Sequence, residues 1–169
     1  MILKGRVRRL SVNDNINTDY VISGRYKFKI QDPKELAKHI FEDIAEDFSS
    51  KIKKGDFIVA GDNFGCGSSR EQAPMAIKAA GVGAVIAKGF ARIFYRNSFN
   101  IGLPLLECDT DSMSEGDSLE VNIEKGIIIN KTQNVELHIK SIPYVMRKLL
   151  KDDGVIEHFK KHGGFKFET

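Results

Sequence analysis

The sequence predicts an α/β protein in which a mixed sheet is flanked by helices. Across residues 56–100, two buried-strand patterns alternate with two helical patterns, which is the order of a βαβ unit with parallel strands. Residues 118–142 instead alternate apolar and polar side chains around turn sequences, as antiparallel hairpins do. The chain of 169 residues is long enough to bury a core without staples, and we expect one domain over residues 1–169.

The amino-terminal third predicts a strand, a loop and a helix. Residues 2–8 alternate apolar and basic side chains, which is typical of a half-buried strand. Residues 11–32 carry Asn, Asp, Ser and Gly too often for regular structure and predict a long polar loop. A helix then begins with Asp32 as N-cap and Pro33 as its first residue. Apolar side chains at a spacing of four continue it as one core-facing stripe, namely Leu36, Ile40, Ile44 and Phe48.

The remaining elements follow in order. The βαβ segment predicts strands at 56–61 and 83–89 and helices at 71–80 and 91–100. A further strand is expected at 103–108, and two short helices at 143–150 and 155–162 precede a glycine pair. The four histidines are assigned to surfaces or to the core rather than to catalysis, and no residue is assigned as a metal ligand; the histidines are His39, His138, His158 and His162.

Composition excludes several classes of protein. A net charge of +3 is too small to imply a nucleic-acid or membrane partner, although an anionic small molecule needs only a local positive site. Cys66 and Cys108 have no metal-type spacing, and they are too few to hold a cubane iron–sulfur cluster. Residues 1–11 are too charged for a secretory signal, and the apolar run at 79–87 is too short to span a bilayer. We therefore expect a reduced, cytoplasmic protein.

The sequence GDNFGCGSSREQAP, at residues 61–74, carries the chemistry. Its glycines allow positive φ angles and close approach of the backbone to a ligand. A helix follows, and the free amides and partial positive charge of a helix N-terminus favour an anion. Arg70 adds a planar fork of donors that fits a carboxylate or a phosphate. The segment therefore predicts an anion-binding site.

A simpler role for the serines is helix capping. Ser68 with Glu71, or Ser69 with Gln72, matches the capping box, so one serine is expected to cap the helix. Pro74 favours a slightly later helix start, because proline is tolerated only in the first turn. The segment lacks the motifs of a P-loop, a dinucleotide-binding turn and a hydrolase nucleophile elbow.

Together with INTDYVISGRY upstream and RIFYRNSFNIGLPLLE downstream, this segment resembles the small subunits of 3-isopropylmalate dehydratase in the aconitase superfamily. The resemblance covers nearly the whole chain. It implies a compact, swivelling β/β/α domain, residues 1–169, that closes over an active site whose [4Fe-4S] cluster lies in a separate large subunit. It also implies a hydro-lyase of leucine biosynthesis, a heterodimer or heterotetramer, that isomerises a hydroxy-dicarboxylic acid, 2-isopropylmalate, by dehydration and rehydration.

The resemblance further implies roles for single residues. Ser68 matches the general base, and Ser69 and Arg70 match residues that bind a substrate carboxylate. Asp19, in NTD, matches an aspartate of the same active site. The GRYKF sequence is expected to set specificity through Arg25 and Phe28.

Phe28 also bears on the choice of substrate. Relatives that act on tricarboxylates place an arginine at that position, whereas an aromatic ring suits an alkyl group. The flanking Lys27 and Lys29 leave homoaconitate, citramalate and dimethylmalate dehydratases open as alternatives.

Physical chemistry limits what the loop can do alone. If the Ser68 hydroxyl resembles water, with a pKa of about 15.7, holding it as an alkoxide at pH 7 requires about 9 units, or roughly 12 kcal/mol. A helix N-terminus supplies about 0.3 to 2 kcal/mol of this. We therefore expect no activity without the large subunit.

Two hypotheses of other classes remain. The glycine–serine segment would also serve a stand-alone anion- or nucleotide-binding module. Four basic side chains near the amino terminus, Lys4, Arg6, Arg8 and Arg9, would also serve RNA binding that weakens with salt.

Overall fold

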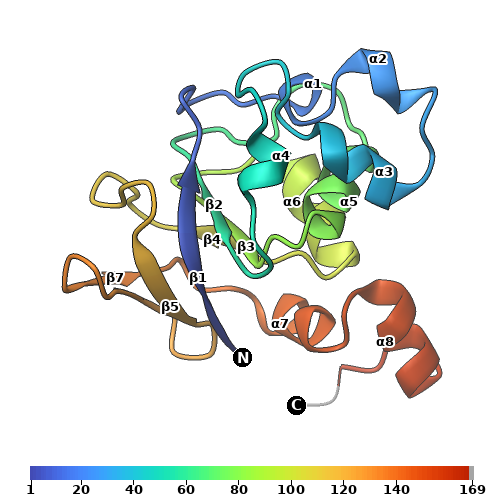
Figure 1. Ribbon diagram of the computed structural model, residues 1–169. Coiled ribbons are helices and arrows are strands. Elements are labelled where there is room, and N and C mark those ends of the chain that lie inside the picture. Colours follow the sequence, from blue (N-terminus) through green and yellow to red (C-terminus); the bar gives the residue numbers. More distant parts are fainter. Residues whose placement is uncertain (168–169) are drawn as a thin grey trace.

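The computed structural model describes residues 1–167, and a seven-stranded mixed sheet forms its centre (Figure 1). The strand order is β4-β3-β2-β1-β5-β6-β7. β1 (Ile2–Arg9) lies in the middle, parallel to β2 on one side and antiparallel to β5 on the other. The parallel half continues through β2 (Phe57–Val59), β3 (Ala84–Ala87) and β4 (Leu105–Glu107). The antiparallel half consists of β5 (Ser118–Asn122), β6 (Ile127–Asn130) and β7 (Val135–His138). The predicted mixed sheet is confirmed.

The two halves of the sheet differ in burial, as their sequences predict. Every residue of β2 and β3 is buried, because neighbouring elements cover both faces of these parallel strands. In β5, buried and half-buried residues alternate, so one face packs on the core and the other approaches solvent. The apolar runs and the alternating run in the sequence therefore correspond to two different environments within one sheet.

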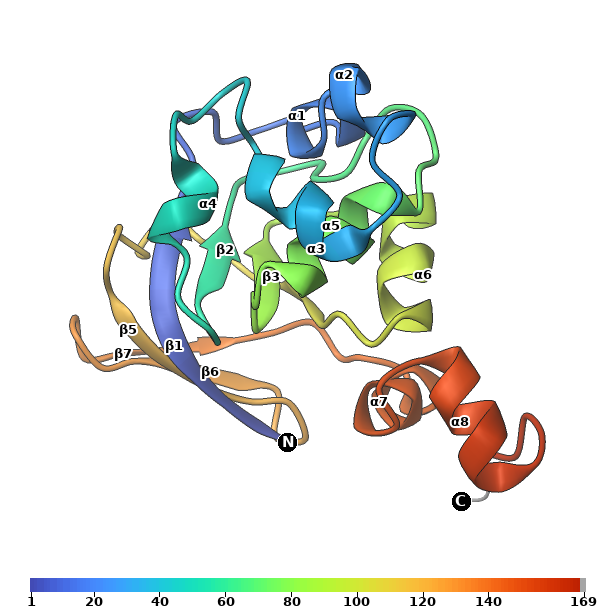
Figure 2. The ribbon, with the colours of Figure 1, turned by 45° about the vertical axis from the view of Figure 1, so that its right-hand side comes forward.

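The longer helices are α5 (Gln72–Ala79), α6 (Arg92–Asn100), α7 (Tyr144–Lys151) and α8 (Val155–His162). Shorter helical segments are α1 (Thr18–Val21), α2 (Gly24–Lys27), α3 (Pro33–Leu36), the 3₁₀ turn η1 (Ala37–His39) and α4 (Phe48–Lys51). Figures 1 and 2 show α1 to α6 grouped at the parallel half, with α7 and α8 forming a separate pair that contacts α6. No helix within residues 1–167 has the length and apolar character needed to cross a membrane.

The single helix predicted from Asp32 to Phe48 is wrong. The chain leaves the helical conformation at Ile40, whose ψ is 134°, and Phe41 has a φ of 57°. This turn places the Phe41 ring in the core, where it packs against Phe48 and Phe64 at centroid distances of 5.2 and 6.3 Å. The apolar spacing did identify core residues, since Leu36, Ile40 and Phe48 are buried, and Ile44 is half-buried. Burial of an additional aromatic ring therefore overrides the local helical pattern.

The polar loop predicted at 11–32 contains two short helices, α1 and α2. Two of the polar residues that argued against regular structure cap these helices. The side chain of Asn17 accepts a hydrogen bond from the Tyr20 amide, and that of Ser23 accepts one from the Arg25 amide.

The predicted serine cap of the next helix is also wrong. Glu71 is the N-cap of α5, and no side chain caps this end. The later start puts Pro74 at the third helical position, where a missing amide costs no internal hydrogen bond. Ser68 and Ser69 therefore lie in the loop before the helix and are not used to cap it.

Candidate active site

The candidate site lies where parallel strands end. β1 leads into the loop that precedes α1, β2 leads into residues 61–71, and β3 leads through residues 88–91 into α6. Because parallel strands end at the same edge of a sheet, these three connections meet there, as ligand-binding loops of open α/β sheets do. The three motifs of the sequence are thus brought together from separate parts of the chain.

Backbone hydrogen bonds join the first two motifs. The amide of Thr18 donates to the carbonyl of Cys66 at 3.0 Å, and the amide of Gly65 donates to that of Ile16 at 2.7 Å. The Thr18 hydroxyl, which is buried, donates to the carbonyl of Ser68 at 2.8 Å. The segment 65–68 is therefore held against the start of α1.

Gly65 fixes the same segment against α6. Its φ is 81°, and a Cβ there would lie 2.2 Å from the Phe94 ring. Only glycine combines this left-handed conformation with such close approach. The close packing brings the serine loop to the N-terminal half of α6.

Asp19 and Arg70 form an ion pair across the two motifs. Asp19 lies in the first turn of α1, and its carboxylate accepts from a guanidinium nitrogen of Arg70. The Arg70 side chain is mostly buried, with 19% of its surface exposed, whereas 57% of the Asp19 side chain is exposed. Since this contact holds one side of the fork, Asp19 orients Arg70.

A cavity of about 450 Å³ lies between the serine loop and α6. Ser68, Ser69 and Arg70 line it on one side. Neither serine side chain makes a hydrogen bond to any of residues 1–167, so both hydroxyls are available to a ligand. The three adjacent residues expected to contact substrate therefore share one cavity.

The opposite wall of the cavity is α6, not the helix that follows the serine loop. Arg92 and Ile93, in the first turn of α6, line it together with Arg96 and Asn97. The helix dipole expected from α5 is therefore supplied by α6, whose first-turn amides have no acceptor within their own helix. Sequence analysis did not assign Arg92 and Arg96 to the site. Their spacing of four after β3 is the signal that could have found them.

Arg25 and Phe28 lie apart from this cavity, and neither lines it. Arg25 donates to the Asp43 carboxylate at 2.5 Å and to the Ser23 hydroxyl at 3.3 Å. The Phe28 side chain projects from the end of α2 with 83% of its surface exposed, and the Lys27 ammonium lies 4.5 Å from its ring. Their expected contact with substrate requires a surface beyond this cavity and remains a prediction.

The cysteines do not form a cluster site. Cys66 lies on the glycine–serine loop, and Cys108 follows β4. Burial raises the pKa of the Cys108 thiol to about 12, which keeps it protonated at neutral pH. Cubane clusters take several thiolates, so the residues of this chain do not fit a [4Fe-4S] cluster.

Fold and site together define the class of protein, a counterpart of the C-terminal domain of aconitases. The model of the aconitase C-terminal domain matches residues 1–110, and the chain belongs to that family. Within it, the chain is a member of the group of 3-isopropylmalate dehydratase small subunits.

Similar proteins support this grouping. Small subunit 2 from Archaeoglobus fulgidus is 54% identical, covering 94% of this chain and 96% of its own. The small subunit from Wolinella succinogenes is 55% identical, covering 94% of each chain. The crystal structure of a 3-isopropylmalate dehydratase (leuD) from Methanocaldococcus jannaschii superposes with a TM-score of 0.91 at 44% identity, covering 96% of both chains.

Proposed function

We propose that this chain is the small subunit of a hydro-lyase that converts 2-isopropylmalate to 3-isopropylmalate in leucine biosynthesis. It would act as a single swivelling domain that closes on a large subunit, in the cytoplasm. The observation that carries the proposal is the cavity in which Ser68, Ser69 and Arg70 converge, with both hydroxyls free of other partners among the described residues. Similarity to the named small subunits over nearly the whole chain supports the same conclusion.

In this proposal the cavity binds and orients a dicarboxylate. Arg70, held by Asp19, donates to one substrate carboxylate, and Ser69 donates a further hydrogen bond. The N-terminus of α6 adds positive potential beside the same carboxylate. In the assembled site Ser68, as its alkoxide, accepts the proton from the carbon next to a carboxylate during dehydration. Its hydroxyl then returns that proton to the other carbon of the double bond when water adds with the opposite regiochemistry.

The energetics assign the remaining chemistry to a partner. The alkoxide cost of roughly 12 kcal/mol exceeds the 0.3 to about 2 kcal/mol of a helix N-terminus. Arg70 and a closed, dry site strengthen the electrostatic contribution, but the exposed serine loop cannot exclude water alone. The cluster that would accept the departing hydroxyl is assigned to the large subunit, because this chain lacks the ligands.

Co-expression with a large subunit of 3-isopropylmalate dehydratase tests the proposal. The complex should isomerise 2-isopropylmalate, and Ser68→Ala should lower kcat by about 10²- to 10⁴-fold, the usual contribution of a general base. Ser50→Ala, which changes an exposed serine on α4, is the matched control and should leave kcat unchanged. Full activity in the Ser68→Ala complex would refute the assigned role.

The identity of the substrate is the most specific part of the proposal. An exposed Phe28 ring favours an alkyl substituent over a third carboxylate. Comparing kcat/KM for isopropylmalate, homoaconitate, citramalate and dimethylmalate in the same complex tests this choice. A preference for homoaconitate would replace the proposed substrate while leaving the role of Ser68 intact.

Two other functions have weaker support. A stand-alone anion-binding module would use the same cavity, and calorimetric binding of phosphate or a nucleotide by the isolated chain would reveal it. RNA binding has less support, because two of the four basic residues of β1 are engaged within the fold. Arg8 donates to Asp56 at 2.7 Å, and Arg9 donates to the carbonyls of Thr110 and Met113.

A further inference from the structure

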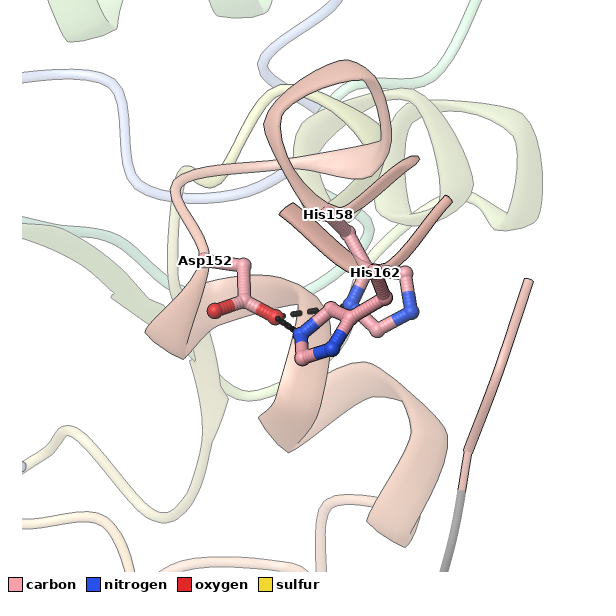
Figure 3. Close-up of side chains that lie close together, drawn as sticks. All are labelled: Asp152, His158 and His162. Carbon is pink, nitrogen blue, oxygen red and sulfur yellow. Dashed lines mark hydrogen bonds and ion pairs between the residues drawn. The ribbon is translucent and has the colours of Figure 1, made fainter. Parts of the chain in front are cut away.

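A cluster of two histidines and an aspartate lies away from the proposed active site, where α7 meets α8 (Figure 3). Asp152 follows the last residue of α7, and His158 and His162 lie one turn apart on α8. A spacing of four places both imidazoles on one face of the helix. The sequence analysis treated both histidines as ordinary surface or core residues.

One carboxylate oxygen of Asp152 holds both rings. It lies 2.7 Å from Nδ1 of His158 and 2.9 Å from Nε2 of His162, as the dashed lines in Figure 3 show. The other oxygen lies 2.6 Å from the Lys161 ammonium. Hydrogen bonds from Lys161 first, and then from the two histidines, hold the pKa of Asp152 well below its ordinary range. The carboxylate is therefore an anion that projects between two imidazoles.

The burial of the three residues is graded. The side chains of His158 and Asp152 are 1% and 4% exposed, whereas that of His162 is 37% exposed. On one face, His158 stacks on Phe167 at a centroid distance of 4.7 Å. The cluster is thus buried at His158 and Asp152, and its solvent-exposed side is at His162.

Hydrogen bonding alone leaves this arrangement incomplete. Nε2 of His158 is buried and has no partner among residues 1–167. An imidazole with one nitrogen free of hydrogen is the form that coordinates metals.

We propose that Asp152, His158 and His162 bind one divalent transition-metal cation of the zinc class, which fastens α8 to the end of α7. Two imidazole nitrogens and a carboxylate oxygen form a common ligand set for zinc, with water completing the coordination. The three donor atoms lie within 4.8 Å of one another.

Only a small movement is needed to accommodate the ion. With metal–ligand bonds of about 2.0 to 2.2 Å, tetrahedral donors lie roughly 3.4 Å apart. The contacts of Asp152 with His158 and His162, at 2.7 and 2.9 Å, must therefore open by about 0.7 and about 0.5 Å. When an imidazole binds a metal through one nitrogen, its ring hydrogen lies on the other nitrogen. Lys161 competes for the carboxylate, but its side chain is 63% exposed and is free to turn towards solvent.

Titration of the full chain, without a polyhistidine tag, tests the site. Calorimetry with Zn²⁺ should give one cation per chain, and Co²⁺ should give visible absorption typical of nitrogen and oxygen ligands. Because loss of an outer partner of a metal ligand already costs about 10- to 100-fold in affinity, His162→Ala should weaken binding by at least about tenfold. His138→Ala, which removes an exposed histidine on β7, is the matched control and should bind normally.

Further measurements distinguish a specific metal site from adventitious binding of the cation. Since His162 is partly exposed, its alanine variant should keep the far-ultraviolet spectrum of the parent chain, and Zn²⁺ should raise the Tm of the parent but not of the variant. Asp152→Asn should abolish the Co²⁺ absorption. Absence of saturable binding, or equal affinity in the parent and His162→Ala, would overturn the proposal.

Discussion

At the scale of single residues, Thr18 connects the two motifs of the candidate site. Its buried hydroxyl donates to the Ser68 carbonyl, so it positions the serine without touching substrate. We expect Thr18→Val to reduce stability by about 1 kcal/mol, the usual value for one hydrogen bond, and to lower kcat of the assembled enzyme with little change in KM. Thr18→Ser keeps the hydroxyl and should recover most of the kcat. Steady-state kinetics of the three complexes would measure this, and a loss confined to KM would contradict the positioning role.

The same residues mark what the sequence could predict of the site. Asp19 and Arg70 were predicted as site residues from motifs 51 positions apart, and the structure joins them in an ion pair. Arg92 and Arg96 were not assigned, because the side of α6 that faces the serine loop depends on packing of Phe94 against Gly65. The local sequence identifies the chemical groups of the site, whereas the orientation of α6 depends on a contact between residues far apart in the chain.

At the scale of elements, Gly65 controls how the serine loop packs on α6. A Cβ at this position would overlap the Phe94 ring, and its φ of 81° disfavours any other residue. We expect Gly65→Ala to destabilise the chain by about 1 to 3 kcal/mol and to displace the loop, lowering activity of the complex. Thermal unfolding and kinetics would measure both effects.

Gly24 provides the control for this substitution. It lies at the first position of α2, its added Cβ would meet no atom within 4 Å, and its φ is not positive. Gly24→Ala should therefore be neutral or stabilising by up to about 1 kcal/mol. If both variants lost equal stability, the close packing at Gly65 would not be the cause.

Asp117 joins several elements of the antiparallel half. Its carboxylate accepts from the Ser114 amide at 2.9 Å and from the side chains of Asn130 and Gln133, both at 2.7 Å. Burial alone would raise the pKa of Asp117, but these three hydrogen bonds outweigh it, and the pKa is lowered. A carboxylate with a lowered native pKa stabilises the fold above its unfolded value of about 3.8, and this contribution is lost as the pH falls through the native pKa.

This linkage gives a prediction with a definite sign. Asp117→Asn should lower the free energy of unfolding by about 1 to 3 kcal/mol at pH 7, and the difference from the parent should narrow below about pH 4. Urea unfolding between pH 3 and 7 would measure the difference. Asp109→Asn, which changes an exposed carboxylate, is the control and should show a smaller gap. If the difference in the free energy of unfolding between the parent and Asp117→Asn widened in acid, the lowered pKa of Asp117 would be contradicted.

The helices show why elements are harder to predict than core residues. The stripe from Leu36 to Phe48 found buried positions, yet the chain turns at Phe41 to bury another ring. The loop at 11–32 contains short helices because Asn17 and Ser23 cap them. By contrast β2, β3 and α6 were predicted correctly, because nothing in their packing opposes the local pattern.

At the scale of the whole molecule, the proposed active site and the antiparallel strands lie in different parts of the sheet. The proposed active site lies at the carboxyl ends of the parallel strands, whereas β5, β6 and β7 form the half furthest along the strand order from β4 (Figures 1 and 2). Ser68 and Ser69 are exposed in the isolated chain, as a site completed by a second subunit requires.

This separation predicts where a large subunit would contact the chain. Its addition should slow amide hydrogen exchange at residues 16–20, 64–70 and 91–93, and should leave the amides of β6 and β7 unchanged. Mass spectrometry of the isolated chain and of the complex would measure this, with Ser68→Ala as a variant that should bind the partner normally while losing activity. Protection confined to β6 and β7 would show that the partner docks elsewhere, and the serine loop could then not face a shared site.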